Sequence, residues 1–74
     1  MKMKVEVKKT KSEGFYIVEV ETENCKFTLF YTYNADFDAW ALVEPKNEKG
    51  YKVFTLSNDF KSTIKTEVLN IINN

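Results

Sequence analysis

Hydrophobic and polar residues alternate along the first half of the chain. Residues 3–9 place apolar side chains at positions 3, 5 and 7 and charged ones at positions 4, 6 and 8, a period that predicts a half-buried strand. Later segments are rich in aromatic and β-branched residues and are separated by short stretches of turn composition. We expect five strands, at about residues 3–9, 15–21, 26–33, 39–44 and 51–56. Their short connections predict hairpins, and therefore an antiparallel meander in sequence order.

The pattern becomes helical near the C-terminus. Ser57 or Asn58 suits the N-cap of a helix over about residues 58–72, and Asp59 favours the positive end of the helix dipole. Five apolar side chains then form one stripe: Phe60, Ile64, Val68, Ile71 and Ile72. Leu69 lies outside this stripe, so we expect it to be exposed. The sequence therefore predicts an α+β fold, an antiparallel meander of about five strands packed on one C-terminal amphipathic helix, as a single domain over residues 1–74.

Composition is consistent with a small folded domain of the cytoplasm. Hydrophobic residues make up 43% of the chain and aromatic residues 15%, which places it outside the disordered class. No apolar stretch approaches the length of a membrane span, and the lysine-rich start has no apolar run behind it as a secretory signal would. The single cysteine, Cys25, cannot form an internal disulfide, and we expect it to be half-buried at the start of a strand. We therefore expect a cytoplasmic protein without a membrane partner.

The residue types that enzymes rely on are scarce. The chain has no histidine, which removes the commonest general base and metal ligand, and its two glycines form no phosphate-binding loop. Residues 34–38 begin like a calcium-binding EF-hand loop, but Ala39 and Pro45 stand where that loop requires glycine and glutamate. The acidic residues Asp36, Asp38 and Glu44 are expected to belong to a solvated loop. The sequence thus predicts no catalytic residue, no metal and no cofactor.

Charge is balanced overall but unevenly distributed. Residues 1–11 contain five lysines and one glutamate, a net charge of +4, whereas residues 13–44 contain seven acids and one lysine, a net charge of −6. Glu19 and Glu21, at a spacing of two, align on one face of the second predicted strand, and Asp36 and Asp38 lie at one end of the sheet. Such an acidic strip attracts a basic surface, for example on a nucleic-acid-handling protein.

Several predicted strands are apolar on both faces, although a helix can cover only one face of a sheet. Some apolar side chains therefore remain on the far face, where they either bind a partner or form a second small core. We predict that the partner-binding residues are Glu19, Glu21, Asp36 and Asp38 for charge, and Phe15, Ile17, Phe30 and Trp40 for apolar contact. The partner would be another protein or a second copy of the chain, which would make a homodimer.

Two alternatives stay open beside a protein-binding module. One is single-stranded nucleic-acid binding through the lysines of the first strand and turn, which are Lys2, Lys4, Lys8, Lys9 and Lys11. Zero net charge, the lack of arginine and the acidic middle of the chain disfavour this alternative. The other is a self-associating structural protein. In size and composition the chain resembles the accessory proteins of phages and mobile elements, which implies an inhibitor or adaptor that binds a host protein.

Overall fold

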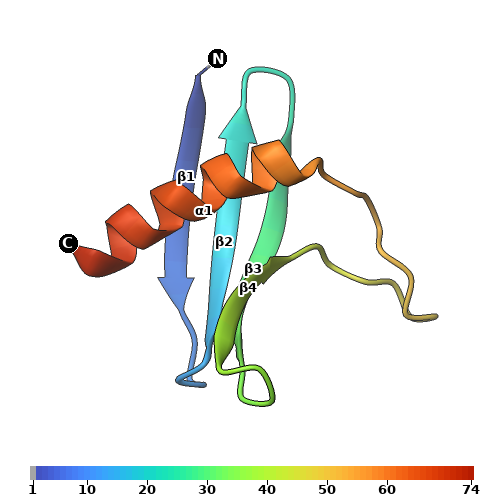
Figure 1. The fold of residues 1–74 in the computed structure, drawn as a ribbon. Helices are drawn as coiled ribbons and strands as arrows, with labels where there is room; N and C mark the ends of the chain where they lie inside the picture. The colour runs from blue at the N-terminus through green and yellow to red at the C-terminus, as the bar shows by residue number, and fades with distance from the viewer. Residues whose placement is uncertain (1) are drawn as a thin grey trace.

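A computed structural model describes residues 2–74 and shows an α+β fold. Four antiparallel strands form one sheet in the order β1-β2-β3-β4, where β1 is Met3–Lys9, β2 is Phe15–Thr22, β3 is Lys26–Asn34 and β4 is Ala39–Val43. Helix α1, Asn58–Asn73, crosses one face of this sheet (Figure 1). The predicted meander on one C-terminal helix is therefore confirmed, with four strands in place of five.

Strand register assigns alternate residues to the face beneath α1, here called the inner face. Val5 pairs with Val20, Val18 with Leu29, and so on across the sheet, so these apolar side chains form continuous rows. The buried core consists of residues from β2, β3, β4 and α1: Val18, Val20, Leu29, Tyr31, Leu42, Ile64 and Val68. The period-two pattern of the sequence therefore coincides with the burial of the strands.

Helix α1 begins where the sequence predicted. The side chain of Ser57 accepts a hydrogen bond from the backbone N–H of Phe60 at 3.2 Å, which satisfies one of the free donors of the first turn. The residues that pack toward the sheet are spaced by four: Phe60, Ile64, Val68 and Ile72. Ile71 was expected in the buried stripe but is exposed, because only this single row of the helix faces the sheet. Within residues 2–74 no helix has the length and apolar character needed to cross a membrane.

The fifth predicted strand is absent. Residues 44–57 instead leave the sheet as a projecting loop, at the right of Figure 1, with only an isolated bridge between Lys46 and Lys52. Its tip is a turn in which Gly50 has a φ of 88°, a value that side chains rarely allow. Tyr51 and Val53 are 69% and 62% exposed, so the apolar residues that suggested a strand lie mostly in solvent. The chain returns to the core only at Phe54 and Leu56.

Glu44 holds the base of this loop. Its carboxylate, with 2% of the residue exposed, accepts hydrogen bonds from Lys61 of α1 at 2.9 Å and from the backbone N–H of Leu56 at 3.3 Å, and Lys52 lies 3.6 Å away. Burial alone would raise the pKa of Glu44, but the hydrogen bond from Lys61, the hydrogen bond from Leu56 and the charge of Lys61 together lower this pKa to about 2. The expectation that Glu44 belongs to a solvated acidic loop is therefore wrong.

Candidate protein-binding surface

The face of the sheet opposite α1, here called the outer face, has an apolar half. Cross-strand register aligns Ile17, Phe30 and Val43 in one row, and Phe15 lies diagonally beside Phe30 with ring centroids 5.4 Å apart. All four side chains are half-buried, and α1 lies on the other face of the sheet (Figure 1). We call these four residues the apolar quartet. Two alanines of β4, Ala39 and Ala41, extend it with small side chains.

The other half of the outer face carries charged side chains whose net charge is zero. Its ionised side chains are three lysines and three glutamates: Lys4, Lys8, Lys26, Glu6, Glu19 and Glu21. Lys8 is 3.2 Å from Glu19, and Lys4 is 3.3 Å from Glu6. Glu21 is aligned between Lys4 and Lys26 in the register. The acidic strip predicted on β2 is thus interleaved with lysines from both neighbouring strands, which reduces its attraction for a basic partner.

The structure brings together five of the eight residues predicted to bind a partner. Phe15, Ile17, Phe30, Glu19 and Glu21 share the outer face. Trp40 does not join them, since its pairing with Tyr33 puts it on the inner face. There the Trp40 ring stacks on Tyr31, with centroids 5.0 Å apart and planes 17° apart, and it also contacts Tyr16 and Tyr33.

Asp36 and Asp38 lie in the turn between β3 and β4, where the backbone of Asp36 and the side chain of Asp38 take part in local hydrogen bonds. The side chain of Asn34 accepts a hydrogen bond from the backbone N–H of Asp36 at 2.9 Å. Asp38 adopts a φ of 48°, a left-handed conformation that aspartate tolerates better than most residues. Its carboxylate accepts a hydrogen bond from the hydroxyl of Tyr33, which raises the pKa of that hydroxyl. Between the two aspartates, Phe37 is 78% exposed.

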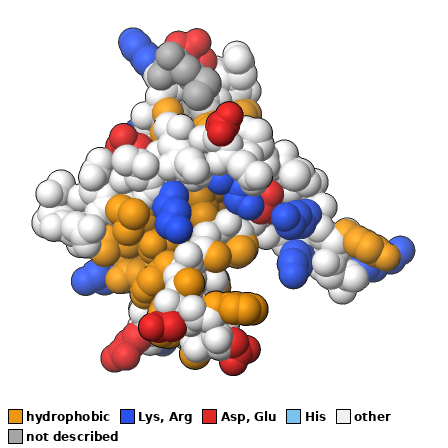
Figure 2. Space-filling view, viewed as in Figure 1, with side chains coloured by type: hydrophobic (Ala, Val, Ile, Leu, Met, Phe, Trp, Pro, Cys, Tyr) orange, Lys and Arg blue, Asp and Glu red, His pale blue; other side chains and the backbone are white. Residues whose placement is uncertain are grey.

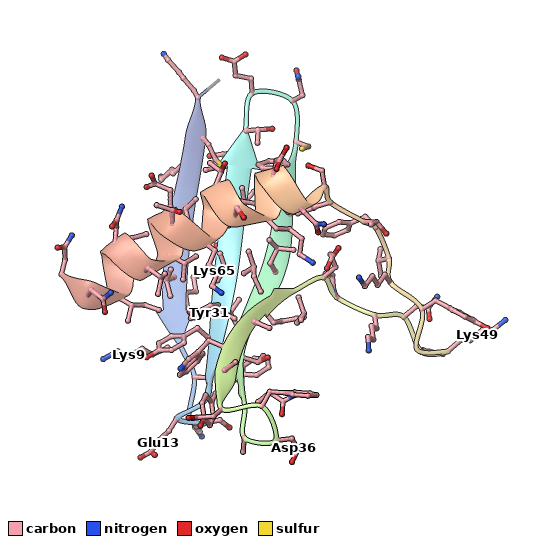
Figure 3. All side chains as sticks on the ribbon, in the orientation of Figure 1. Lys9, Glu13, Tyr31, Asp36, Lys49 and Lys65 are labelled. Atoms are coloured by element: carbon pink, nitrogen blue, oxygen red, sulfur yellow. The ribbon has the colours of Figure 1, made fainter. Side chains whose placement is uncertain are left out.

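The lysines of the nucleic-acid alternative do not form one surface. Lys4 and Lys8 are on the outer face and have the glutamate partners described above, whereas Lys9 is aligned with Tyr16 on the inner face. Lys2 and Lys11 lie outside β1, at its two ends. Figure 3 shows Lys9 projecting from the lower end of β1. Neither face of the sheet therefore presents a continuous row of lysines to the phosphate backbone of a nucleic acid.

The acidic residues and the cysteine of residues 2–74 do not form a metal-binding cluster. No group of three or more histidine, cysteine, aspartate or glutamate residues there is close enough to hold a metal ion. Cys25 is exposed in the turn before β3, with its sulfur 3.3 Å from the hydroxyl oxygen of Thr22. The expectation of a half-buried Cys25 was wrong, because β3 begins one residue later and the turn holds the side chain outside the sheet.

One member of the apolar quartet was missed by sequence reasoning. Val43 alternates with Leu42, and pairing in the β3–β4 hairpin places it opposite Phe30. The signal was the alternation of residues 39–44, but the phase of that alternation relative to β3 depends on the turn that joins the two strands.

Comparison of the chain with protein-family models, with curated proteins and with solved structures found no match.

Proposed function

We propose that this chain is a non-enzymatic protein-binding module that acts through the outer face of its sheet. The observation that supports the proposal is the apolar quartet, a contiguous group of large side chains on the face that α1 leaves uncovered. Contiguous apolar groups on a surface mark interaction sites more often than scattered residues do. Phe15 and Phe30 supply large contact areas with few rotatable bonds, which favours tight packing against a partner.

The charged half of the outer face argues for a particular kind of partner. Because its lysines and glutamates neutralise one another, net charge would add little to the attraction. The proposed partner is therefore a protein with a flat apolar surface and mixed charges around it, bound mainly by burial of the quartet. This differs from the expectation of a basic surface, for example on a nucleic-acid-handling protein. A cytoplasmic inhibitor or adaptor of the kind found in phages and mobile elements remains part of the proposal.

A capture experiment with matched variants tests the proposal. Tagged wild-type protein, the outer-face variant Phe30→Thr and the control variant Tyr51→Thr are incubated with a nuclease-treated bacterial lysate, and bound proteins are identified by mass spectrometry. Thr28 and Thr32 already occupy the outer face beside Phe30, so threonine suits this strand. Tyr51 is exposed on the projecting loop and is not a member of the quartet.

We expect a protein that wild type and Tyr51→Thr retain and Phe30→Thr loses, while all three remain folded by circular dichroism. Retention of the same proteins by Phe30→Thr would refute the proposal. Sedimentation of the purified protein tests whether the partner is a second copy of the chain. A dimer that dissociates on dilution and is weakened by Phe30→Thr would show that a second copy covers the outer face.

A further inference from the structure

The two edges of the sheet are protected to different degrees. An edge strand presents unpaired backbone N–H and C=O groups, and proteins commonly shield such an edge with lysines, prolines or a covering element. The edge strand β1 contains four charged residues, whereas β4, Ala-Trp-Ala-Leu-Val, contains neither a charge nor a proline. The projecting loop departs beyond Val43 and returns to α1 without pairing along β4 (Figure 1). The sequence of β4 itself thus carries none of the usual deterrents.

The backbone groups of this edge that point outward can be identified from the register. The N–H of Tyr33 donates to the C=O of Gly14 at 2.9 Å, so the backbone groups of Tyr33 face β2 and not β4. Tyr33 and Trp40 therefore form a non-hydrogen-bonded pair, and the N–H and C=O of Trp40 point away from the sheet. Two residues later, those of Leu42 do the same. Together they present two N–H and two C=O groups at the edge, and of these the C=O of Trp40 accepts a long hydrogen bond from Lys65 at 3.5 Å.

A groove runs beside these groups. It has a volume of about 330 Å³ and is lined by three residues of β4 and four of α1: Trp40, Ala41, Leu42, Asn58, Lys61, Ser62 and Lys65. Figure 2 shows this region as a hollow beneath α1, with blue lysine side chains over the orange apolar surface. The groove is therefore bounded by a free strand edge on one side and by the polar flank of a helix on the other.

The ionised groups that line the groove are both cationic. Lys61 is already paired with the buried Glu44. Lys65 is half-buried, and no carboxylate in residues 2–74 lies within 4 Å of its amine. Its only polar contact described is a long one, 3.5 Å from its Nζ to the C=O of Trp40. Figure 3 shows the Lys65 amine pointing from α1 toward the sheet. A half-buried cation without a counter-ion favours an anionic ligand.

We propose that this groove binds an extended segment of a partner protein in which acidic and apolar residues alternate, added to β4 as an extra strand. Backbone bonds to Trp40 and Leu42 supply the pairing, as in other cases of strand addition. An N–H of the segment donates to the C=O of Trp40 in place of the Lys65 amine. Lys65 can then pair with an acidic side chain of the segment that faces α1. Side chains on the opposite face continue the outer face beside Val43.

A second copy that pairs through its own β4 fits the groove less well. Its β4 would bring no carboxylate to Lys65, because Ala39–Val43 contains none. The groove is also a different surface from the apolar quartet, so this proposal and the proposed function can fail separately.

Amide-resolved NMR with a defined peptide tests the proposal. The probe is acetyl-Thr-Val-Glu-Val-Glu-Val-Thr-amide. Its comparators replace both glutamates by lysine, or methylate the backbone nitrogens of both glutamates and of the second and third valines, which removes the N–H groups that could pair with β4 in either strand direction. On titration to about 1 mM acidic peptide, we expect chemical-shift changes and slower hydrogen exchange at the Trp40 and Leu42 amides. The outward-facing amides of the other edge, Val5 and Val7, are the internal control and should not change. Both comparator peptides should bind at least tenfold more weakly (about the effect of one charge-assisted hydrogen bond).

Charge reversal separates this site from general attraction to lysines. Lys65→Glu should weaken binding of the acidic peptide by about tenfold or more, and Lys49→Glu at the exposed tip of the projecting loop should leave it unchanged. Equal binding by Lys65→Glu, equal binding of the methylated peptide, shifts at Val5 instead of Trp40, or no binding at all would each overturn the proposal. So would concentration-dependent protection of Trp40 and Leu42 in the protein alone, since a second copy would then occupy the edge.

Discussion

Replacement of Glu44 by glutamine tests whether one buried carboxylate holds the projecting loop and α1 against the sheet. Glutamine keeps the size of the side chain but removes its charge, so Lys61 loses its counter-ion. The pKa of Glu44 falls from its ordinary value of 4.5 to about 2, a difference of about 2.5. This difference corresponds to about 3 kcal/mol of folding free energy at neutral pH. A chain of 74 residues is expected to have a total stability of only about 4–11 kcal/mol, so the loss is a large fraction.

The pH dependence follows from the direction of the shift. A carboxylate whose pKa is lower in the folded state stabilises the protein fully above its ordinary pKa, and this contribution is lost as the pH falls through the folded-state value. The free-energy gap between wild type and Glu44→Gln should therefore be about 3 kcal/mol at pH 7, roughly half as large at pH 3, and close to zero below pH 2.

Urea denaturation followed by Trp40 fluorescence measures this gap. With an m-value of about 1 kcal/mol/M, the midpoint of Glu44→Gln at pH 7 should lie about 2–3 M below that of wild type. Glu48→Gln, at an exposed position of the same loop, is the matched control and should differ from wild type by less than about 0.5 kcal/mol. A gap below about 0.5 kcal/mol at pH 7, or a gap equal at pH 7 and pH 3, would show that the ion pair does not stabilise the fold.

Three further predictions concern burial, capping and exposure. Leu29→Ala, at a fully buried core position, should destabilise the protein by about 2–5 kcal/mol in urea, whereas Leu69→Ala on the exposed side of α1 should cost less than about 1 kcal/mol; equal losses would contradict the placement of α1. Ser57→Ala should cost about 1 kcal/mol, because it removes the hydrogen bond to the N–H of Phe60; an unchanged midpoint would mean that this cap is not formed. Cys25 should react with a thiol reagent as completely in the native protein as in urea, and protection in the native state would place the thiol inside.

The strands and the helix could be predicted because their periodicity follows from burial. Residues 3–9 alternate in sequence and in exposure alike, and the spacing of Phe60, Ile64 and Val68 matches the single row of α1 that packs on the sheet. Residues 51–56 carry a similar apolar content, yet they form no strand. Here the buried Glu44 accepts a hydrogen bond from the N–H of Leu56, and the amine of Lys52 lies 3.6 Å from its carboxylate. The sequence shows Glu44 as one acid among many, and only three-dimensional contacts distinguish it.

The candidate surface was predictable in part for a similar reason. Alternation within each strand showed which side chains share a face of that strand, but the phase between strands depends on turn geometry and register. The register brings Phe15, Ile17 and Phe30 together and assigns Trp40 to the opposite face. It also adds Val43 to the surface. The groove beside β4 was invisible in the sequence, because its two sides come from elements separated by the whole projecting loop.

The order of the strands has a consequence for how the chain folds. Each strand pairs only with its sequence neighbours, so the sheet can assemble through short loop closures, which are fast. Docking of α1 over β1 instead joins the two ends of the chain, which makes it the contact of largest sequence separation. We expect the helix to dock after the folding transition state. Val68→Ala should then accelerate unfolding and leave the folding rate nearly unchanged in stopped-flow measurements, whereas a mainly slower folding rate would show that the helix docks early. In a chain still emerging from the ribosome, the sheet would expose its apolar inner face until α1 has been synthesised and docks on it.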